Sequence, residues 1–535
     1  MENTSNVRWF LVSSIYGAIP SLHNICLSLS VKQKMLRAKR YHIFLVLSLA
    51  FAAARVHAQH FAPIAVGKYS GVHAAKVNPA LTANSPYKWH VNIVGAWANV
   101  NNNYINLQLP YSAYHAIFGT MPEQYKTVNG NPRFDSAFLY EDLNRKRKFA
   151  GVGAMAYLPS VLIQYKKLHL GWLNDAVVLG RATGVNEPLA YALRRELSYN
   201  KRAFNYFILD KNNNYNLDRG AANVNAYVSS GINISYSQDL PWKQKMMFGA
   251  TVKKIWGLGG AYFKWDDMQI NKVRQNVLQF DQTNIHYALY QGRGRGSAID
   301  LGWGMIYHKP DYKQNGDYLK KHKQYKYKFG LSLLDLGSVR YDDVKATDIV
   351  NATSTIWDAT GFRDQFIGVD PTPSITPLNN IFKDMSGYTT DTRSENIGLP
   401  TRFIASVDYQ YSKRVFINYQ VMQSLRGRFT QHMRYQSYAM IAPRYEKEKW
   451  EISVPVLLEY DYRSLRAGFA LRAGCFYIGS NSALNFLYTR NVRDADIYLG
   501  FTISQLKGTK NDWFIKRRKE ASEQKDNKKP DCEKM

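Results

Sequence analysis

Four charged residues stand out because each lies in a segment whose side chains alternate between apolar and polar types. They are Asp335, Asp408, Arg466 and Arg472. In a β-strand, successive side chains point to opposite faces, so a charge at a polar position lies away from the apolar face. Such charges could bind or repel solutes in a water-filled interior, but on the polar face of any sheet they could also be simply solvated.

Histidine and serine offer a second kind of chemistry, the hydrolysis of lipids by an activated serine. This reaction needs a serine, a histidine and a carboxylate or amide within hydrogen-bond reach of one another. The histidines that follow the first 58 residues lie in no G-x-S-x-G or other nucleophile setting; they include His73, His90, His286, His308 and His432. We therefore predict that the protein is not an enzyme, and keep a lipid hydrolase only as a second alternative.

Metal and cofactor sites find no support in the sequence. Asp210–Asn214 resembles the start of a calcium-binding loop, but the sixth position is Tyr215 and the twelfth is Ala221, where glycine and glutamate are required. The three cysteines show no metal-ligand spacing: Cys26, Cys475 and Cys532. No metal and no cofactor are predicted.

The segment 450–473, WEISVPVLLEYDYRSLRAGFALRA, indicates how the chain positions its charges. It alternates twice around a short polar connection at 461–464, which predicts two strands with one apolar and one polar face. The apolar face contains Ile452, Val454, Val456, Leu458, Leu465, Ala467, Phe469 and Leu471. In a soluble sandwich this face would form the core, whereas in a membrane barrel it would contact lipid and leave Arg466 and Arg472 in the lumen.

Composition favours the membrane barrel. Aromatic residues make up 14% of the chain, including 38 tyrosines, and tyrosine is enriched where a membrane surface meets water. The mean hydropathy of −0.38 does not argue against a barrel, because only every second residue of a barrel strand contacts lipid. The net charge of +29 is spread along the chain instead of forming a recognition patch, so nucleic acid is not an expected partner. The expected partners of the positive charges are anionic lipid headgroups and lipopolysaccharide. We also expect some of the charges to line the lumen.

The N-terminal region carries the pattern of a secretory signal. Residues 35–58 combine a basic start, an apolar run at 43–54 and Val56-His57-Ala58 before a cleavage position. Residues 1–34 are then an over-extended gene start or a long basic n-region. Residues 59–86 show no strand pattern and could be either a lead-in or a plug in the lumen. The tail at 507–535 is basic and polar, and we predict that it is disordered.

Residues 87–506 contain roughly 14 alternating segments, within a range of 12 to 16, which predicts an all-β fold: a transmembrane antiparallel β-barrel with a few short helices in its loops. Long connections are expected at 110–147, 185–221, 266–296 and 342–398. If these are extracellular, and if 105–109 is the second strand, the first strand would begin outside the membrane. A strand near the N-terminus must therefore be missing or superfluous.

Several segments resemble a known family. They are SGVHAAKVNPAL (70–81), KFGLSLLDLGSVRY (328–341), LPTRFIASVDYQ (399–410), APRYEKEKWEISVPVL (442–457) and LRAGFALRAGCFYIGSN (465–481). They look like an uncharacterised family of Bacteroidota outer-membrane β-barrels, described as a domain of unknown function. That family is similar in pattern to fatty-acid transporter barrels and to barrels associated with type IX secretion. The resemblance implies the fold and the outer-membrane location, but transfers no functional residue.

Together, these patterns predict a non-enzymatic protein of the cell outer membrane that acts as a porin-like or transporter-like passage for small or amphipathic solutes. The alternative is a structural scaffold of a secretion or surface complex, whose proteins would then be its partners. In either case Asp335, Asp408, Arg466 and Arg472 are predicted to face the lumen.

Overall fold

The computed structural model describes residues 62–507, with gaps at 112–114, 116–120, 128–129, 132–137, 199–213, 242–243, 275–276, 309–324, 353–354, 359–374 and 485–490. The described residues all belong to one compact unit of the chain, Val56–Met535. The predictions for the gene start at 1–34, the signal peptide at 35–58 and the tail beyond residue 507 fall outside the described part of the chain.

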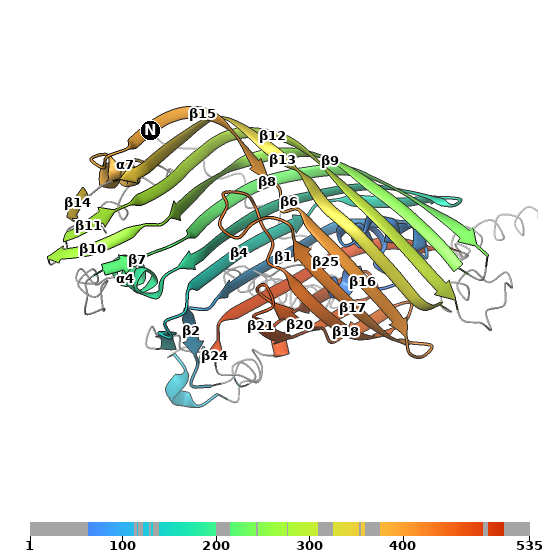
Figure 1. Ribbon diagram of the computed structural model, residues 1–535. Helices are drawn as coiled ribbons and strands as arrows, with labels where there is room; N and C mark the ends of the chain where they lie inside the picture. Colours follow the sequence, from blue (N-terminus) through green and yellow to red (C-terminus); the bar gives the residue numbers. More distant parts are fainter. Residues whose placement is uncertain are drawn as a thin grey trace, which may run out of the picture. The chain divides into compact units, whose positions relative to one another are not determined.

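Fourteen antiparallel strands form a closed barrel, which confirms the predicted fold (Figure 1). Ten strands are continuous: β1 (Tyr87–Asn102), β6 (Leu168–Val185), β8 (Gly220–Leu240), β9 (Gln244–Asp266), β12 (Thr283–His308), β13 (Tyr325–Ala352), β17 (Val415–Ser424), β18 (Tyr438–Glu446), β23 (Phe476–Ser480) and β25 (Asp494–Leu506). Four are broken in two: β4 (Lys148–Tyr157) with β5 (Ser160–Tyr165), β15 (Tyr388–Gly398) with β16 (Arg402–Gln410), β19 (Trp450–Ser453) with β20 (Val456–Glu459), and β21 (Ser464–Ala467) with β22 (Phe469–Ala473).

Each barrel strand pairs with its neighbour along the chain, and the last strand pairs with the first. The closing pair, β1 with β25, runs from Tyr87 opposite Leu506 to Asn101 opposite Asp494. The closing pair removes the two edges that an open sheet would have, although among the described strands β15 is paired with β13 alone and leaves its other edge open at the long-loop side of the wall.

The alternation of side chains places apolar residues on the outer surface of the barrel. In the 450–473 hairpin, the apolar side chains point outward, with exposed fractions between 37% and 67% for Ile452, Val454, Val456, Leu458, Leu465 and Phe469. Arg466 and Arg472, which have the opposite parity, are buried. Four of the exposed tyrosines lie near the same end of the strands: Tyr165, Tyr236, Tyr307 and Tyr411. An apolar outer band bordered by aromatic residues is the pattern of a lipid-facing barrel surface.

The outer band gives a direct test of membrane insertion. An arginine in place of Val454, which is 41% exposed midway along its broken strand, should lower the free energy of unfolding by about 2–4 kcal/mol in lipid vesicles. Urea-induced unfolding in vesicles measures this change, and Val454→Leu serves as the control. Equal urea midpoints for Val454→Arg and Val454→Leu would show that this face does not contact hydrocarbon.

The connections between strands differ at the two ends of the barrel. One end, which we call the short-loop end, has connections at 166–167, 241–243, 309–324, 411–414, 447–449 and 474–475. The opposite, long-loop end has connections at 103–147, 186–219, 267–282, 353–387, 425–437, 460–463 and 481–493. The first strand begins, and the last strand ends, at the short-loop end.

Three predicted segments are wrong, one strand and two connections. Residues 105–109 are not a barrel strand: β2 (Ile105–Gln108) pairs with β3 (Leu139–Glu141) and β24 (Asn491–Val492) in a separate small sheet. Removing this strand from the barrel resolves the conflict over the direction of the first strand. The connections predicted at 266–296 and 342–398 are also shorter, because β12 begins at Thr283, β13 continues to Ala352 and β15 begins at Tyr388.

The strands β9, β12 and β13 are the longest, at 23, 26 and 28 residues, and continue into an extension at the long-loop end. The extension contains a second sheet of four strands, which lie in the order β7 (Asn214–Asn216), β10 (Gln269–Arg274), β11 (Val277–Asp281) and β14 (Thr355–Asp358). The extension has its own apolar core, to which α7 (Thr376–Phe382) contributes Ile381 and Phe382. α4 (Glu187–Ser198) lies in the connection that follows β6. No helix in the described part of the chain is long and apolar enough to cross a membrane.

Candidate functional site

Residues 62–86, which we call the plug, fill the interior of the barrel. They form three short helices, α2 (Ala62–Ala65), η1 (Gly71–Lys76) and η2 (Pro79–Asn84), in which nearly every residue is buried. The plug packs with inward-facing residues of the wall in shared apolar clusters. The sequence left two alternatives open for 59–86, a lead-in or a plug. The described residues of this segment occupy the lumen.

Asn78 anchors the plug to the wall and also starts η2. Its side-chain oxygen accepts a hydrogen bond from the Ala80 amide (2.9 Å), which caps the helix, and Pro79 occupies the first turn. Its side-chain nitrogen donates to the carbonyl oxygens of Trp303 (2.9 Å) and Leu331 (3.1 Å), on β12 and β13. One side chain therefore satisfies both the plug backbone and two wall strands.

The wall has no side chains where this part of the plug lies. Gly249, on β9, and Gly302, on β12, are cross-strand partners. A Cβ atom on Gly249 would lie 2.5 Å from the Ala80 nitrogen, and one on Gly302 would lie 2.2 Å from the Asn78 side-chain oxygen. These two glycines form a seat that only a residue without a side chain permits.

Filling this seat should loosen the plug. The methyl group of Gly302→Ala must displace the Asn78 side chain, which costs its two bonds to the wall, or about 1–3 kcal/mol of plug docking. Conductance of the protein in planar bilayers is expected to rise for this variant. The control is Gly153→Ala, where a Cβ atom would lie 3.1 Å from the side chain of Trp97 and 3.3 Å from that of Leu179, both on wall strands. Equal conductance in the two variants would count against the seat.

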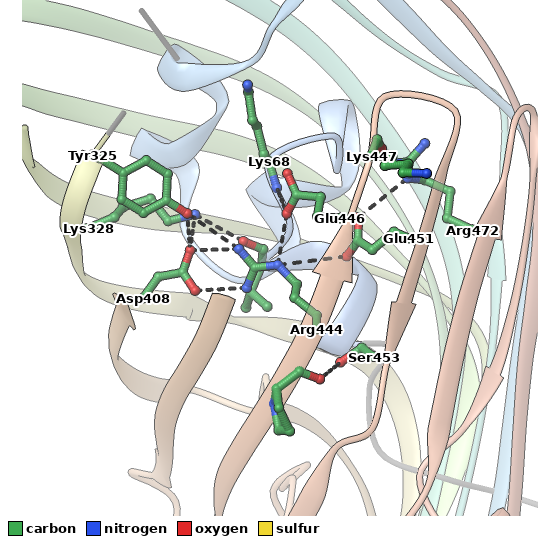
Figure 2. Close-up of polar contacts among 12 residues, drawn as sticks. Lys68, Tyr325, Lys328, Asp408, Arg444, Glu446, Lys447, Glu451, Ser453 and Arg472 are labelled. Carbon is green, nitrogen blue, oxygen red and sulfur yellow. Dashed lines mark hydrogen bonds and ion pairs between the residues drawn. The ribbon is translucent and has the colours of Figure 1, made fainter. Parts of the chain in front are cut away.

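A cluster of buried charges surrounds the plug near the short-loop end. This rim cluster comprises Lys328, Asp408, Arg444, Glu446, Glu451 and Arg472 (Figure 2). At its centre, the Arg444 side chain has no exposed surface and binds both oxygens of Asp408, at 2.7 and 2.8 Å. The same guanidinium also contacts Glu446 (2.9 Å) and lies 4.0 Å from Glu451. Such bidentate, charge-assisted bonds fix the geometry of both partners.

The rim cluster holds the plug by its backbone. The Lys68 amide donates to Glu446 (3.3 Å), and the Lys328 ammonium donates to the Val66 carbonyl oxygen (3.0 Å). Between them, Gly67 leaves room for Glu451, because a Cβ atom there would lie 2.6 Å from the carboxylate. Arg472 completes the contact, with its guanidinium 4.9 Å from the centre of the Tyr69 ring.

A second group of charges, the middle cluster, lies further along the lumen. The Lys253 ammonium binds Asp300 (2.7 Å) and Asp335 (2.6 Å), and Asp335 also pairs with Arg402. Asp335 has a left-handed backbone (φ 56°) at a register shift in β13, a conformation that aspartate tolerates better than most residues. Lys76 is the plug residue whose side chain extends toward the wall beside the middle cluster.

Lys76 pairs with Asp175 of the wall, and both residues line a cavity of about 30 Å³ beside the middle cluster. A cavity of this size has room for about one or two water molecules. A cavity of this size is too small to hold a sugar or an amphipathic molecule.

The four charges predicted from the sequence are all buried, but they occupy three places. Asp408 and Arg472 belong to the rim cluster, and Asp335 belongs to the middle cluster. Arg466 lies apart from both: it pairs with Glu459 (2.8 Å) and Asp494 (2.7 Å). Sequence reasoning missed the residues that bind these charges to one another and to the plug, chiefly Lys253, Asp300, Lys328, Arg402 and Arg444. Their inward parity within alternating strands was the available signal.

The environment of His73 is expected to make plug docking sensitive to pH. Its ring is 3% exposed and packs edge-on against His90, Tyr157 and Tyr477, with Lys76 as the nearest cation. Burial lowers the pKa of His73 well below its usual value, and the neighbouring His90 and Lys76 lower it further. The docked ring is therefore neutral, while a released plug regains an ordinary histidine pKa of about 6.5.

We therefore expect conductance to increase as the pH falls below about 6.5, since the released state then binds the extra proton. Docking should weaken by about 1.4 kcal/mol for each pH unit below that value, until the docked ring also titrates. Bilayer conductance between pH 7.5 and 5 measures this effect, and His73→Phe should remove most of the pH dependence. If His73→Phe has the same pH profile as the wild type, another group causes the pH dependence of the conductance.

The described residues show no group of three or more histidine, cysteine or acidic side chains arranged to hold a metal ion. His286 contacts Asp348 (2.8 Å), while the ring nitrogens of His90 and His432 face the backbone amides of Val72 and Gly398. These contacts do not build a serine–histidine pair. The absence of enzymatic activity stays a prediction.

The fold and the lumen define a class of protein: a closed fourteen-stranded antiparallel barrel with an internal plug held by buried charges. The chain belongs to DUF5723, a family of unknown function, whose model matches residues 79–481. This confirms the predicted membership of a barrel family of unknown function, whereas the assignment to Bacteroidota stays a prediction. No curated protein matches the chain.

Several solved barrels align with the chain at low identity. The toluene transporter TodX of P. putida aligns over 82% of this chain and 94% of its own, with 11% identity and a TM-score of 0.36. A FadL homologue of Pseudomonas aeruginosa covers the same shares, with 9% identity and a TM-score of 0.35. A deletion mutant of the TodX channel aligns over 82% and 95%, with 12% identity and a TM-score of 0.39. Likenesses this remote do not define a shared function.

Proposed function

We propose that this protein is a gated passage of the outer membrane for small or amphipathic solutes, closed in the present conformation by its plug. The observation that carries the proposal is the way in which the lumen is filled. A barrel of this size encloses more space than its own inward side chains occupy. Here a separate segment of the chain occupies that space, and the contacts that hold it include polar ones to the wall.

The nature of these contacts supports a plug that can move. Asn78, Lys76 and the backbone at residues 66–68 bind polar groups that water could also satisfy if the plug withdrew. The wall behind the plug is lined by buried ion pairs, which remain paired with each other once it leaves. A lumen lined in this way would stay wettable, as a passage for polar or amphipathic molecules requires.

The outer-membrane location is part of the same proposal. The exposed apolar band and its tyrosines support insertion into a bilayer. In outer-membrane barrels the short turns face the periplasm and the longer loops face outward. On that basis the short-loop end, with the plug and the rim cluster, is periplasmic, and the extension is extracellular.

Reconstitution tests the passage. The full protein and a variant lacking residues 62–84 are inserted into planar bilayers for KCl conductance, and into liposomes for swelling in arabinose. We expect brief, rare openings for the full protein, but a continuous conductance and rapid swelling for the shortened one. If the shortened variant forms a heat-resistant barrel and still conducts neither ions nor sugar, the passage is refuted.

The extension favours a second candidate, a scaffold for surface proteins. Its four-stranded sheet and α7 enclose a core that is separate from the lumen, so it can present a stable surface beyond the membrane. Purification in mild detergent distinguishes the two functions. Stoichiometric partner proteins that are lost when the β10–β11 hairpin (residues 269–281) is removed would support the scaffold.

A further inference from the structure

The outer surface of the barrel carries charge at one place where apolar residues are expected. Three neighbouring strands, β8, β9 and β12, present three successive rows of outward side chains, each row formed by cross-strand partners. From the short-loop side, the rows are Ile232, Val252 and Ile299; Ser230, Lys254 and Ser297; and Val228, Trp256 and Arg295. The first row is apolar, the second has a lysine between two serines, and the third combines a tryptophan with an arginine.

An open apolar groove of about 920 Å³ lies against these rows. Trp172, Ile232 and Val252, which help to line it, have exposed fractions of 53%, 61% and 60%. Trp172 is held in place by a hydrogen bond from its indole nitrogen to the Ser230 hydroxyl (2.9 Å). The groove is thus a shaped apolar surface with a polar upper border formed by Ser230, Lys254 and Ser297.

Lys254 is exposed on this surface and has no ion-pair partner in the described part of the chain. Its neighbour Lys253 points the other way, into the lumen, where it binds two aspartates. A lysine that faces lipid without a counter-ion destabilises a barrel. An anion supplied from outside the chain would remove this cost.

Two arginines strengthen the case for an external anion. Arg295 lies two residues from Ser297, the partner of Lys254, so the two cations are diagonal neighbours, about 7–8 Å apart at the backbone. Arg295 is itself directly opposite Arg340 on β13, and like charges in that position repel each other. Asp342 pairs with Arg340 (3.0 Å) and also interacts electrostatically with Arg295, so two arginines share one carboxylate, while Lys254 has no carboxylate partner among the described residues.

The height of this pair along the barrel matches a lipid headgroup. Lys254 is ten residues from Gln244, where β9 begins at the short-loop end. At about 3.3 Å per residue and a tilt of about 40°, this is about 25 Å, the height of the apolar band of an outer-membrane barrel. The cations therefore lie at the outer edge of the hydrocarbon, with the groove below them inside it.

We propose that this surface is a binding site for a net-anionic, phosphate-bearing, acylated lipid of the outer leaflet. The phosphate lies between Lys254 and Arg295, and the acyl chains lie in the groove against Trp172, Ile232 and Val252. The match of charge above and apolar surface below selects a lipid instead of a free anion. This inference rests on the proposed membrane location, but not on the passage, so a barrel that conducts nothing could still bind the lipid.

Native mass spectrometry of the detergent-solubilised protein tests the site, with lipid A as the probe. We expect lipid A adducts on the wild type, and adducts at least about tenfold weaker on Lys254→Met and on Arg295→Gln, because a charge-assisted bond to phosphate is lost. Lys345→Met is the matched control, since Lys345 is an exposed lysine on β13 outside the groove. Equal adducts in all variants, or equally strong phosphatidylcholine adducts, would overturn the proposal.

Urea-induced unfolding in vesicles gives a second, independent test. Relative to the wild type, Lys254→Met should be more stable without lipid A and less stable with it. In phosphatidylcholine vesicles the variant should unfold at a slightly higher urea concentration than the wild type, since a lysine at the edge of the apolar band costs at most about 1 kcal/mol. In vesicles that also contain lipid A, the wild type should gain stability and the variant should not. Inorganic phosphate alone should stabilise neither. Equal gains from lipid A in both proteins, or a gain from free phosphate, would refute a lipid site.

Discussion

A disulfide between the plug and the wall is expected to keep the lumen closed under every condition that otherwise opens it. The hydroxyl oxygens of Thr82, on η2, and Ser235, on β8, are 2.6 Å apart and buried. Cysteines at these two positions are close enough for an S–S bond with little movement of the backbone. In a background where Cys26, Cys475 and Cys532 are replaced by serine, the oxidised Thr82→Cys/Ser235→Cys protein should show only baseline conductance at pH 5.

Reduction of the disulfide should restore conductance in the same bilayer, which shows that the barrel itself is intact. The two single-cysteine variants are the controls, because they carry the same substitutions but cannot form the bond. They should respond to acid in the presence and in the absence of reductant. Conductance through the oxidised double variant would show that solutes pass by a route that does not require the plug to leave β8.

The sequence predicted the wall of the barrel better than its contents, and the hairpin at 450–473 shows why. Whether Val454 or Arg466 faces lipid depends only on its parity within one strand, which is visible locally. The same local signal misled at Ile105–Gln108, since alternation also occurs in the small sheet with β3 and β24. Periodicity identifies a strand, but it does not say which sheet the strand joins.

The sequence could not decide between a plug and a lead-in for 59–86, because the position of this segment depends on residues far away in the chain. Short helices with many small residues give neither a strand period nor a long helical stripe. What places Asn78 in the lumen is the seat at Gly249 and Gly302, more than 150 residues later. Each of these glycines has an ordinary local explanation, and only their registration on neighbouring strands creates the seat.

The charge clusters show the same division between local and distant information. The inward direction of Asp408 follows from alternation, whereas Asp335 has the parity of the outward Phe329 and Leu331 and turns inward only at the register shift in β13. The partners of both residues come from other strands: Lys253 is 82 residues from Asp335, and Arg444 is 36 residues from Asp408. The sequence therefore predicted single lumen charges, which are ordinary in any barrel. It did not predict that they combine into clusters, one of which binds the plug.

The rim cluster leads to the second large effect, because Arg444 neutralises several buried carboxylates. Arg444→Met would leave Asp408 and Glu446 without their main partner, and removing one side of such a buried group costs about 3–5 kcal/mol. Part of this cost should fall on the plug, whose Lys68 amide binds Glu446. We therefore expect Arg444→Met to unfold at a lower urea concentration and also to conduct at neutral pH, where the wild type is closed.

Arg466→Met separates these two effects. Arg466 is equally buried and binds two carboxylates, Glu459 and Asp494, but it takes no part in the rim cluster that holds the plug backbone. The Arg466→Met substitution should lower the free energy of unfolding by a similar amount, about 3–5 kcal/mol, without opening the lumen. If both arginine variants conduct equally, general loosening of the barrel opens the lumen, and the rim cluster is not its latch. If only Arg444→Met conducts, and Asp408→Asn with Glu446→Gln restores its stability, the cost comes from unpaired charge.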